Sequence, residues 1–168
     1  MGTFQESMNE YREQLESGTL LRAYRGLMDY VMWLRSFFEK KYPAYSVSGS
    51  IYQGYMDMTY FSFFPESFKL RQLKVGIVFV HSTFRFEVWL FGYNKGVQAK
   101  YWKLFKESGW SKYHIPSTTK GVDSIVEAIL VENPDFSDLD ALTEQIEKGA
   151  VKFIEDIDNF LSKHTEQG

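Results

Sequence analysis

The sequence contains no cysteine and only three histidines among its 168 residues. Without cysteine the chain can build neither a disulfide bond, nor a catalytic thiolate, nor a cysteine-rich zinc site. The histidines, His81, His114 and His164, are scattered and show no HxxxH or HExxH spacing. Cysteine chemistry is therefore excluded, and the spacing argues against a histidine-based zinc site.

Long apolar segments and an excess of basic residues are also missing. No window reaches 18 consecutive apolar residues, and the first residues lack the apolar segment of a secretion signal. We therefore expect a soluble, cytoplasmic protein without membrane contact. The net charge is −3 and the pI is about 5.7, a balance that argues against a nucleic-acid partner, whose phosphates attract basic surfaces.

Aromatic residues are what the sequence has in excess, with 15 Phe, 11 Tyr and 4 Trp. Each supplies a large area for burial, so the core, or one exposed face, is expected to be unusually aromatic. A chain of this length has the usual size of one domain and buries roughly two thirds of its unfolded surface. We therefore expect a single domain over residues 1–168.

Apolar residues spaced three and four apart predict four helices. The predicted helices span residues 3–17, 19–42, 94–108 and 137–164. Each begins at a residue able to cap a helix: Thr3, Thr19, Asn94 and Ser137. Gly18 is the predicted stop of the first helix and Pro43 of the second. The tail after His164 is expected to fray.

Alternating aromatic and β-branched residues predict strands over residues 52–64, 73–81 and 84–92. Ser82 and Thr83 form the predicted hairpin between the last two. Neither face of the first strand, from Tyr52 to Phe64, is cleanly polar, which indicates a central strand covered on both sides. The segment between residues 66 and 72 is a basic connector with room for one helical turn.

Residues 122–133 fit both helical and strand spacing. A strand at Ser124–Glu132 is favoured, because the segment is short and β-branched and Pro134 follows it. The predicted class is therefore α+β, with a mainly antiparallel sheet of about four strands and helices packed against it in the order ααβββαβα.

Five segments carry a resemblance: GYMDMTYFSFFP (54–65), FRFEVWLFGYNK (84–95), YWKLF (101–105), YHIPSTTKG (113–121) and VENPDFSDLDALT (131–143). Together they resemble a family of uncharacterised small bacterial proteins with a domain of unknown function. The resemblance covers nearly the whole chain and implies a single-domain soluble bacterial protein, but it brings no activity and no catalytic residue. In topology, the element order is also similar to the αβββαβ core of the PD-(D/E)xK nuclease superfamily.

That nuclease-like similarity implies two strand carboxylates that hold Mg²⁺ or Mn²⁺, with a lysine to assist the attacking water. Asp57 and Glu87 are the only acids in the three strands, and Gln98 lies in the following helix, where some members of that superfamily carry a glutamine. Trp89 stands where the pattern requires the lysine. The structural interpretation pairs Glu87 with a base such as Arg85 and leaves Asp57 as a hydrogen-bonded polar residue.

Two other features suggest binding rather than catalysis. An aromatic face beyond what the core absorbs could bind a partner or a flat ligand, although packing in the core is the favoured explanation of its residues: Tyr52, Tyr55, Tyr60, Trp89 and Trp102. The loop from Ser117 to Gly121 has hydroxyls and Lys120, which could bind an anion, although a plain polar loop explains it as well.

The sequence therefore predicts a non-catalytic module that binds a ligand or protein through its sheet and needs no cofactor. Candidate binding residues are Asp57, Glu87, Trp89, Tyr55, Gln98 and Lys120. The alternative is a divalent-metal-dependent hydrolase or nuclease that uses Asp57 and Glu87. A third hypothesis is self-association as a homodimer through an exposed edge or helix.

Overall fold

The structure is a computed structural model and describes residues 1–164. Along the chain its elements are α1 (Phe4–Ser17), α2 (Thr19–Lys41), β1 (Ser46–Val47), β2 (Met58–Phe64), α3 (Glu66–Leu70), β3 (Leu73–Val80), β4 (Arg85–Gly92), α4 (Lys95–Ser108), β5 (Ser124–Val131) and α5 (Leu139–His164). The α+β class is confirmed, with five strands in the sheet rather than about four. The predicted order omitted the two shortest elements, β1 and α3. The predicted fraying after His164 lies outside the described residues.

The strands form one antiparallel sheet in the order β1-β2-β3-β4-β5. Each strand lies beside its neighbour in the sequence, so the topology needs no crossover. In the register, Tyr60 lies opposite Val78, and Val78 lies opposite Glu87. Because directly paired residues share a face, this register assigns every side chain of β2, β3 and β4 to one of two faces.

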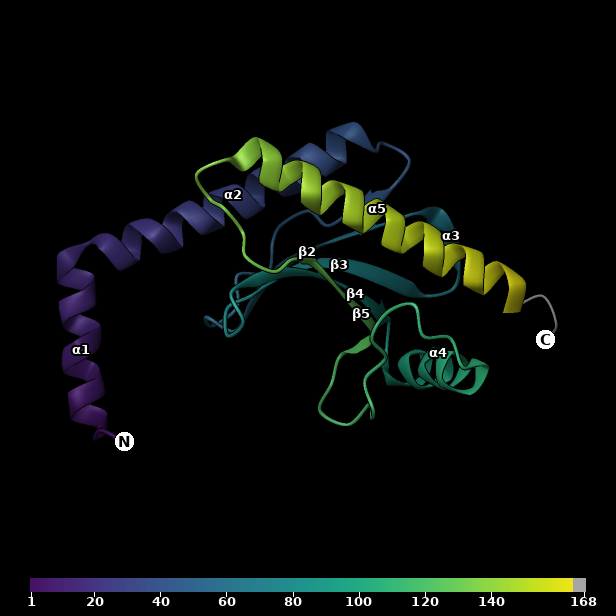
Figure 1. The fold of residues 1–168 in the computed structure, drawn as a ribbon, viewed down its shortest axis with the longest axis horizontal. Helices are drawn as coiled ribbons and strands as arrows, with labels where there is room; N and C mark the ends of the chain where they lie inside the picture. The colour runs from purple at the N-terminus through teal and green to yellow at the C-terminus, as the bar shows by residue number, and fades with distance from the viewer. Residues whose placement is uncertain (165–168) are drawn as a thin grey trace.

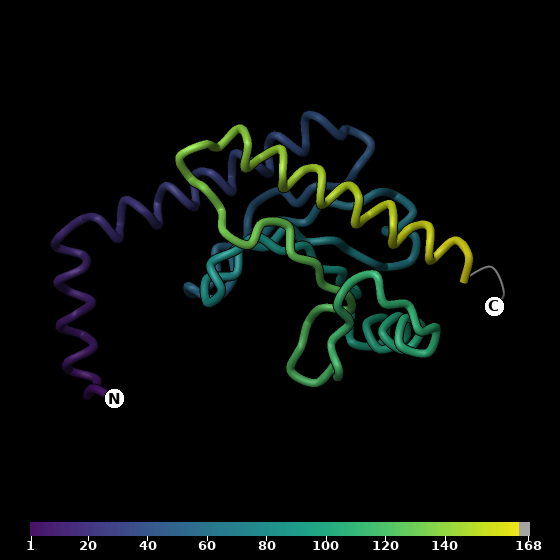
Figure 2. The backbone as a smooth tube through the Cα atoms, in the orientation of Figure 1, coloured from purple at the N-terminus to yellow at the C-terminus, as the bar shows by residue number. Residues whose placement is uncertain are grey.

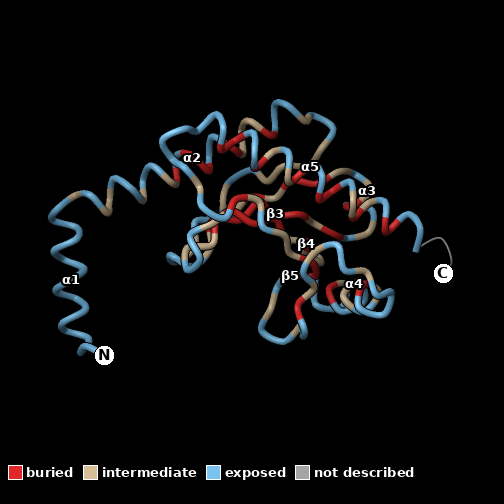
Figure 3. Tube along the Cα trace, viewed as in Figure 1, coloured by how far each residue is buried: buried red, intermediate tan, exposed pale blue. Residues whose placement is uncertain are grey.

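Helices α2 and α5 lie together on one side of the sheet (Figure 1). The strand residues beneath them form what we call the closed face: Thr59, Phe61, Phe63, Val75, Ile77, Phe79, Phe86, Val88 and Leu90, all buried. Phe38 of α2 is 0% exposed and its ring centroid lies 4.6 Å from that of Phe63. Figure 3 shows the buried residues concentrated between the sheet and these two helices. The hydrophobic core is therefore one layer between α2, α5 and the closed face.

Polar contacts at the margins of the hydrophobic core hold α5 in place. Tyr42, after α2, donates a hydrogen bond to Glu147 Oε1 at 2.5 Å. Further along α5, Asp156 accepts hydrogen bonds from Tyr113 Oη at 2.5 Å and Lys112 Nζ at 2.9 Å. Because Tyr113 and Lys112 come from the connection between α4 and β5, Asp156 joins that connection to the helical layer.

The predicted first helix is confirmed as α1, with a capping box between Thr3 and Glu6 and with Gly18 in a left-handed conformation at its end. No residue of α1 is buried. Figures 1 and 2 show it projecting beyond the sheet and the other helices, at a steep angle to α2. The helix thus forms by local capping without a tertiary surface to cover its apolar side chains.

The first strand is shorter than predicted, because the chain turns back between residues 53 and 57. Tyr52 does not share a strand with Tyr60 but pairs with it across the turn. Gly54 has φ +74°, and a Cβ there would collide with the Met58 carbonyl oxygen. The Thr59 hydroxyl donates to the Gln53 carbonyl at 2.7 Å and therefore accepts from His81 Nε2 at 2.9 Å, which fixes the turn against β3.

Four other expectations need correction. Gly18 rather than Thr19 occupies the N-cap position of α2, and no side chain caps that helix. β2 is not covered on both sides, since only its odd-numbered residues and Phe64 are buried. The β3–β4 hairpin is confirmed, but its turn is longer than Ser82–Thr83 and includes Phe84, whose φ is +53°. Asp138 rather than Ser137 caps α5, since Asp138 Oδ1 accepts from the Ala141 N–H at 3.1 Å. The strand favoured at Ser124–Glu132 is confirmed as β5 and ends at Val131.

Candidate ligand-binding face

The second face of the sheet, which we call the open face, carries Met58, Tyr60, Ser62, Lys74, Gly76, Val78, Val80, Arg85, Glu87, Trp89 and Phe91. Gly76, Val78 and Glu87 are buried among these neighbours. Neither α2 nor α5 covers the open face, and α4 lies only beside its end, near the last residues of β4 (Figure 1). Tyr60, Trp89 and Phe91 are half-buried, although the strands that carry them have fully buried residues on the closed face. The open face is thus an accessible surface with an aromatic centre.

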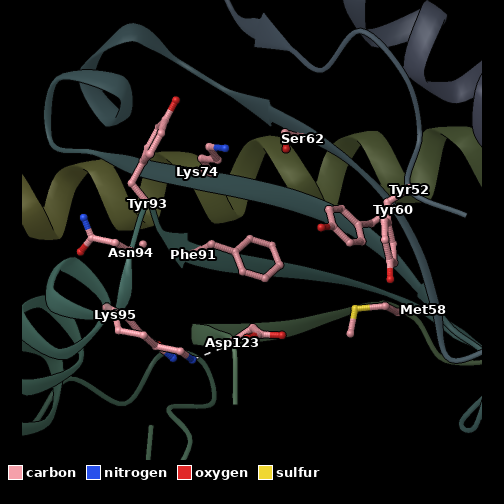
Figure 4. A pocket seen from close by; sticks show the side chains of 12 residues that line it. Tyr52, Met58, Tyr60, Ser62, Lys74, Phe91, Tyr93, Asn94, Lys95 and Asp123 are labelled. Carbon is pink, nitrogen blue, oxygen red and sulfur yellow. Dashed lines mark ion pairs between the residues drawn. The ribbon is translucent and has the colours of Figure 1, made fainter. Parts of the chain in front are cut away.

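A hollow of about 490 Å³ lies on this face (Figure 4). Its walls come from the turn before β2, from strands β2, β3 and β4, and from the start of α4. The lining residues are Tyr52, Met58, Tyr60, Ser62, Lys74, Phe91, Gly92, Tyr93, Asn94, Lys95, Gln98 and Asp123. This volume is within the range of small-molecule sites.

Three aromatic rings line one side of the hollow. The Tyr52 and Tyr60 ring centroids are 5.1 Å apart, and the Tyr60 and Phe91 centroids are 5.9 Å apart, with the planes tilted by 35° and 33°. The Phe91 ring lies directly over Gly76, where a Cβ would come within 2.7 Å of the Phe91 ring edge. Because residue 76 has no side chain, the Phe91 ring can pack against the backbone of β3 at this position.

The other side of the hollow is polar and carries net positive charge. Lys74 Nζ lies 4.3 Å from the centroid of the Tyr93 ring, and no carboxylate within residues 1–164 pairs with it. Lys95 Nζ lies 3.6 Å from Asp123 Oδ1, the pair joined by the dashed line in Figure 4. With two lysines against one aspartate, the lining has a charge of +1.

A close approach of backbones fixes α4 at the end of the hollow. Asn94 Oδ1 accepts a hydrogen bond from the Val97 N–H at 2.9 Å and so caps the helix as predicted. A Cβ at Gly92 would lie 2.5 Å from the Gln98 backbone nitrogen. The buried Gln98 side chain donates to the Val122 carbonyl at 2.7 Å, which joins α4 to the segment before β5. Gln98 is therefore at the site, but its amide is used structurally.

Burial raises the pKa of Tyr60 above its usual 10.0, with Tyr52 and Asp123 adding to the effect. The phenol consequently stays neutral at physiological pH. A neutral hydroxyl can both donate and accept, so the Tyr60 side chain offers a ring face and a hydrogen-bonding group to a bound molecule.

Glu87 and Trp89 lie on the open face but outside the hollow. Glu87 is 6% exposed and accepts from Arg85 Nε at 3.0 Å and from Trp89 Nε1 at 2.9 Å. The hydrogen bond that Arg85 donates to Glu87 raises the pKa of Arg85. Glu87 lines a separate depression of about 510 Å³ with residues that include His114 and Glu127. The predicted pairing with Arg85 is confirmed.

Asp57 is exposed and lies in the turn before β2, where its Oδ1 accepts the Tyr55 N–H at 2.8 Å. Hydrogen bonds from the Tyr55 and Met58 N–H groups lower the pKa of Asp57. Asp57 precedes β2 and Glu87 lies in β4, and β3 separates these two strands in the sheet, so about two strand spacings, roughly 9–10 Å, lie between the strands that the two residues belong to or adjoin. The structure does not bring the two carboxylates together. No group of three or more potential metal-ligating side chains occurs within residues 1–164.

The remaining candidates are dispersed. The Tyr55 side chain is 91% exposed in the turn, and Lys120 is exposed in a loop where its N–H donates to Thr118 Oγ1 at 3.1 Å. Trp102 donates to the Pro116 carbonyl at 2.7 Å, away from the three rings.

Sequence reasoning missed Lys74 and Phe91. The available signal was Gly76, a glycine inside an apolar strand, which marks a place where something lies close to the backbone.

Fold and site together define an antiparallel sheet domain with one face sealed by two helices and one aromatic face open. Residues 4–161 match the family model described as Domain of unknown function (DUF7000), and the chain therefore belongs to that family. No curated protein and no solved structure matches the chain. Within residues 1–164, no helix is long and apolar enough to cross a membrane.

Proposed function

We propose that the chain is a non-catalytic binding module whose ligand is a flat, negatively charged small molecule held in the hollow of the open face. One observation carries the proposal: the rings of Tyr60 and Phe91 and the ammonium of Lys74 line the same hollow. We further propose that the module acts as a single domain in the bacterial cytoplasm, without a nucleic-acid partner.

The chemistry of the lining selects the ligand class. Aromatic side chains favour a planar partner, which they can contact face to face or edge to face. Lys74 has only the Tyr93 ring as a described partner, so a carboxylate or phosphate of the ligand would gain a charge-assisted hydrogen bond there. Neutral Tyr60 and Ser62 add hydroxyl groups that can fix the orientation of the ligand.

Matched pairs of probes test both requirements. The pairs are indole-3-acetate with indole-3-acetamide, and AMP with adenosine; in each pair the planar group is the same and only the first member is negatively charged. Thermal unfolding is followed with each probe in excess, because a ligand that binds only the folded state raises the Tm. We expect an anionic member to raise the Tm more than its neutral partner does.

Two substitutions assign the effect to the hollow. Lys74→Met should weaken binding of the anionic probe by about tenfold, the equivalent of one charge-assisted hydrogen bond. Lys148→Met on α5 makes the same charge change on the far layer and should leave binding unchanged. Among residues 1–164, Lys148 forms one ion pair, with Glu144 at 3.6 Å. The proposal is wrong if neither anionic probe raises the Tm, or if Lys74→Met responds as the parent does.

A further inference from the structure

A second feature of the molecule is not explained by ligand binding on the open face. α1 is amphipathic, with Phe4, Met8, Tyr11 and Leu15 on one side of the helix, and these side chains are 82%, 42%, 49% and 38% exposed. An amphipathic helix normally buries such a stripe. Here every residue of α1 is exposed, as Figure 3 shows along its whole length.

An apolar groove of about 500 Å³ lies beside the beginning of α2. One wall extends along α2 from Leu20 through Tyr24 and Leu27 to Tyr30. The opposite wall includes Phe84, Phe136 and Leu139. The exposed stripe and the apolar groove therefore belong to the same chain, and neither is covered.

We propose that the groove binds the α1 helix of a second copy of this chain, and that the exchange is reciprocal. The lengths agree: the stripe from Phe4 to Leu15 and the wall from Leu20 to Tyr30 each extend for about 15 Å at 1.5 Å per residue. An apolar helix face in a groove is a common mode of recognition. Two-fold symmetry would use both features in both copies, as most homodimers do.

The exposed area also agrees with that of a stable dimer. At about 200 Å² for each large side chain, the four stripe residues offer roughly 400 Å². Met56, Phe84, Phe136 and Leu139, which are 53%, 59%, 37% and 43% exposed in the groove, offer a similar area. Each copy would bury both surfaces, giving roughly the 800 Å² per partner of a standard interface. One surface alone supplies only half.

The chain's own α1 is a poor occupant of the groove. Gly18 is at once the C-cap of α1 and the N-cap of α2, so no linker separates the two helices. An antiparallel helical hairpin uses a loop of about two to five residues. For α1 to lie in its own groove, the helices beside Gly18 would have to unwind.

Sedimentation equilibrium of the full chain tests the dimer. We expect a mass near twice the chain mass of 19.7 kDa. Met8→Glu in the stripe and Leu139→Glu in the groove should each weaken the dimer tenfold or more, roughly the effect of losing one central apolar contact. Asn9→Glu adds the same charge on the polar side of α1 and should leave the dimer intact. A monomer at all accessible concentrations, or a dimer that tolerates both apolar substitutions, would overturn the proposal.

Thiol cross-linking tests which α1 fills the groove, since the sequence has no native cysteine to react. Met8→Cys and Leu139→Cys chains are prepared separately, mixed, and treated with a short bismaleimide. We expect a covalent dimer that contains one chain of each kind, formed faster than either variant forms one alone. A double variant that cross-links only within a monomer would instead assign the groove to the chain's own helix and overturn the proposal.

Discussion

The two faces of the sheet are made by the same strands but differ in what covers them. On the closed face, aromatic rings such as Phe61 and Phe63 lie against Phe38 of α2 and are at most 1% exposed. On the open face, Tyr60 and Phe91 are half-buried around a hollow and lie near the lysines that line it. Aromatic content alone therefore does not distinguish core from site in this protein; the presence or absence of a helix does.

The difference separates stability from binding. Side chains on the closed face are enclosed on all sides, so their removal leaves a cavity that the packed layer cannot fill. The aromatic and lysine side chains that line the hollow already contact solvent, so their removal costs little folding free energy. Substitutions on the closed face should consequently lower the free energy of unfolding strongly. Substitutions of the rings and lysines that line the hollow should weaken ligand binding with little change in that free energy.

The largest effect is expected where α2 packs on the closed face. Phe38→Ala should lower the free energy of unfolding by about 3–5 kcal/mol, the usual cost of removing a buried phenylalanine. Urea unfolding at constant m-value measures the change. A loss below about 1 kcal/mol would show that α2 does not seal this face.

A smaller effect is expected where α4 meets the end of the sheet. Gly92→Ala should destabilise by about 2 kcal/mol, within the range for overpacking, because its Cβ would meet the backbone of Gln98. Gly26→Ala in α2, where nothing in the chain lies within 4 Å of the added Cβ, should instead stabilise by about 0.5–1 kcal/mol when both chains compared carry Met8→Glu, which keeps the groove empty. Urea unfolding should therefore show a lower free energy of unfolding for Gly92→Ala and a higher one for Gly26→Ala. A change in the same direction for both would contradict the described position of α4.

The features that the sequence alone predicts are those determined by residues close to one another along the chain. The caps at Thr3, Gly18 and Asn94 act within one helical turn, and the bounds of α1 and α4 differ by at most one residue from those that the sequence predicts. Alternation in β4 correctly grouped Arg85, Glu87, Trp89 and Phe91 on one face. These features need no knowledge of the rest of the chain.

The remainder depends on contacts between distant residues. The turn that places Tyr52 opposite Tyr60 follows from Gly54, Asp57 and the hydrogen bonds of Thr59, and alternation alone suggested one long strand. The hollow combines Lys74, Phe91 and Asp123, whose proximity follows from strand register and from where α4 begins. Composition could not reveal which face the helices leave open.

The contact at Asp156 predicts a pH dependence. Burial raises the pKa of Asp156, but hydrogen bonds from Tyr113, Lys112 and Lys152 outweigh it, so the pKa lies below its usual 3.8. The stabilisation is therefore complete above about pH 3.8 and is lost as the pH falls through the lowered folded-state pKa. Asp156→Asn should cost about 1–2 kcal/mol at pH 7 and reduce the acid sensitivity of unfolding.

Asp158→Asn is the matched control for Asp156, since it makes the same charge change two residues further along α5, and Asp158 forms no ion pair within the described chain. Its stability should stay within about 0.5 kcal/mol of the parent. Equal acid profiles for the two variants would show that Asp156 does not hold the α4–β5 connection to α5.

The smallest effect on stability is expected at the hollow. Tyr52→Ala, at a side chain that is 45% exposed, should change the free energy of unfolding by less than about 1 kcal/mol. It should nevertheless weaken binding of the anionic probe, because one of the three rings is lost. Parallel urea unfolding and probe titration measure both quantities. A large loss of stability with unchanged binding would reverse the assignment of the two faces.

Chemical-shift mapping tests the central contrast most directly. The backbone amides of the ¹⁵N-labelled full chain are followed while indole-3-acetate or AMP is added. We expect the largest shifts at Tyr60, Lys74 and Phe91, with little change at closed-face residues such as Phe61. Largest shifts around Leu27 and Phe136 in the apolar groove, or no shifts with either probe, would contradict this expectation.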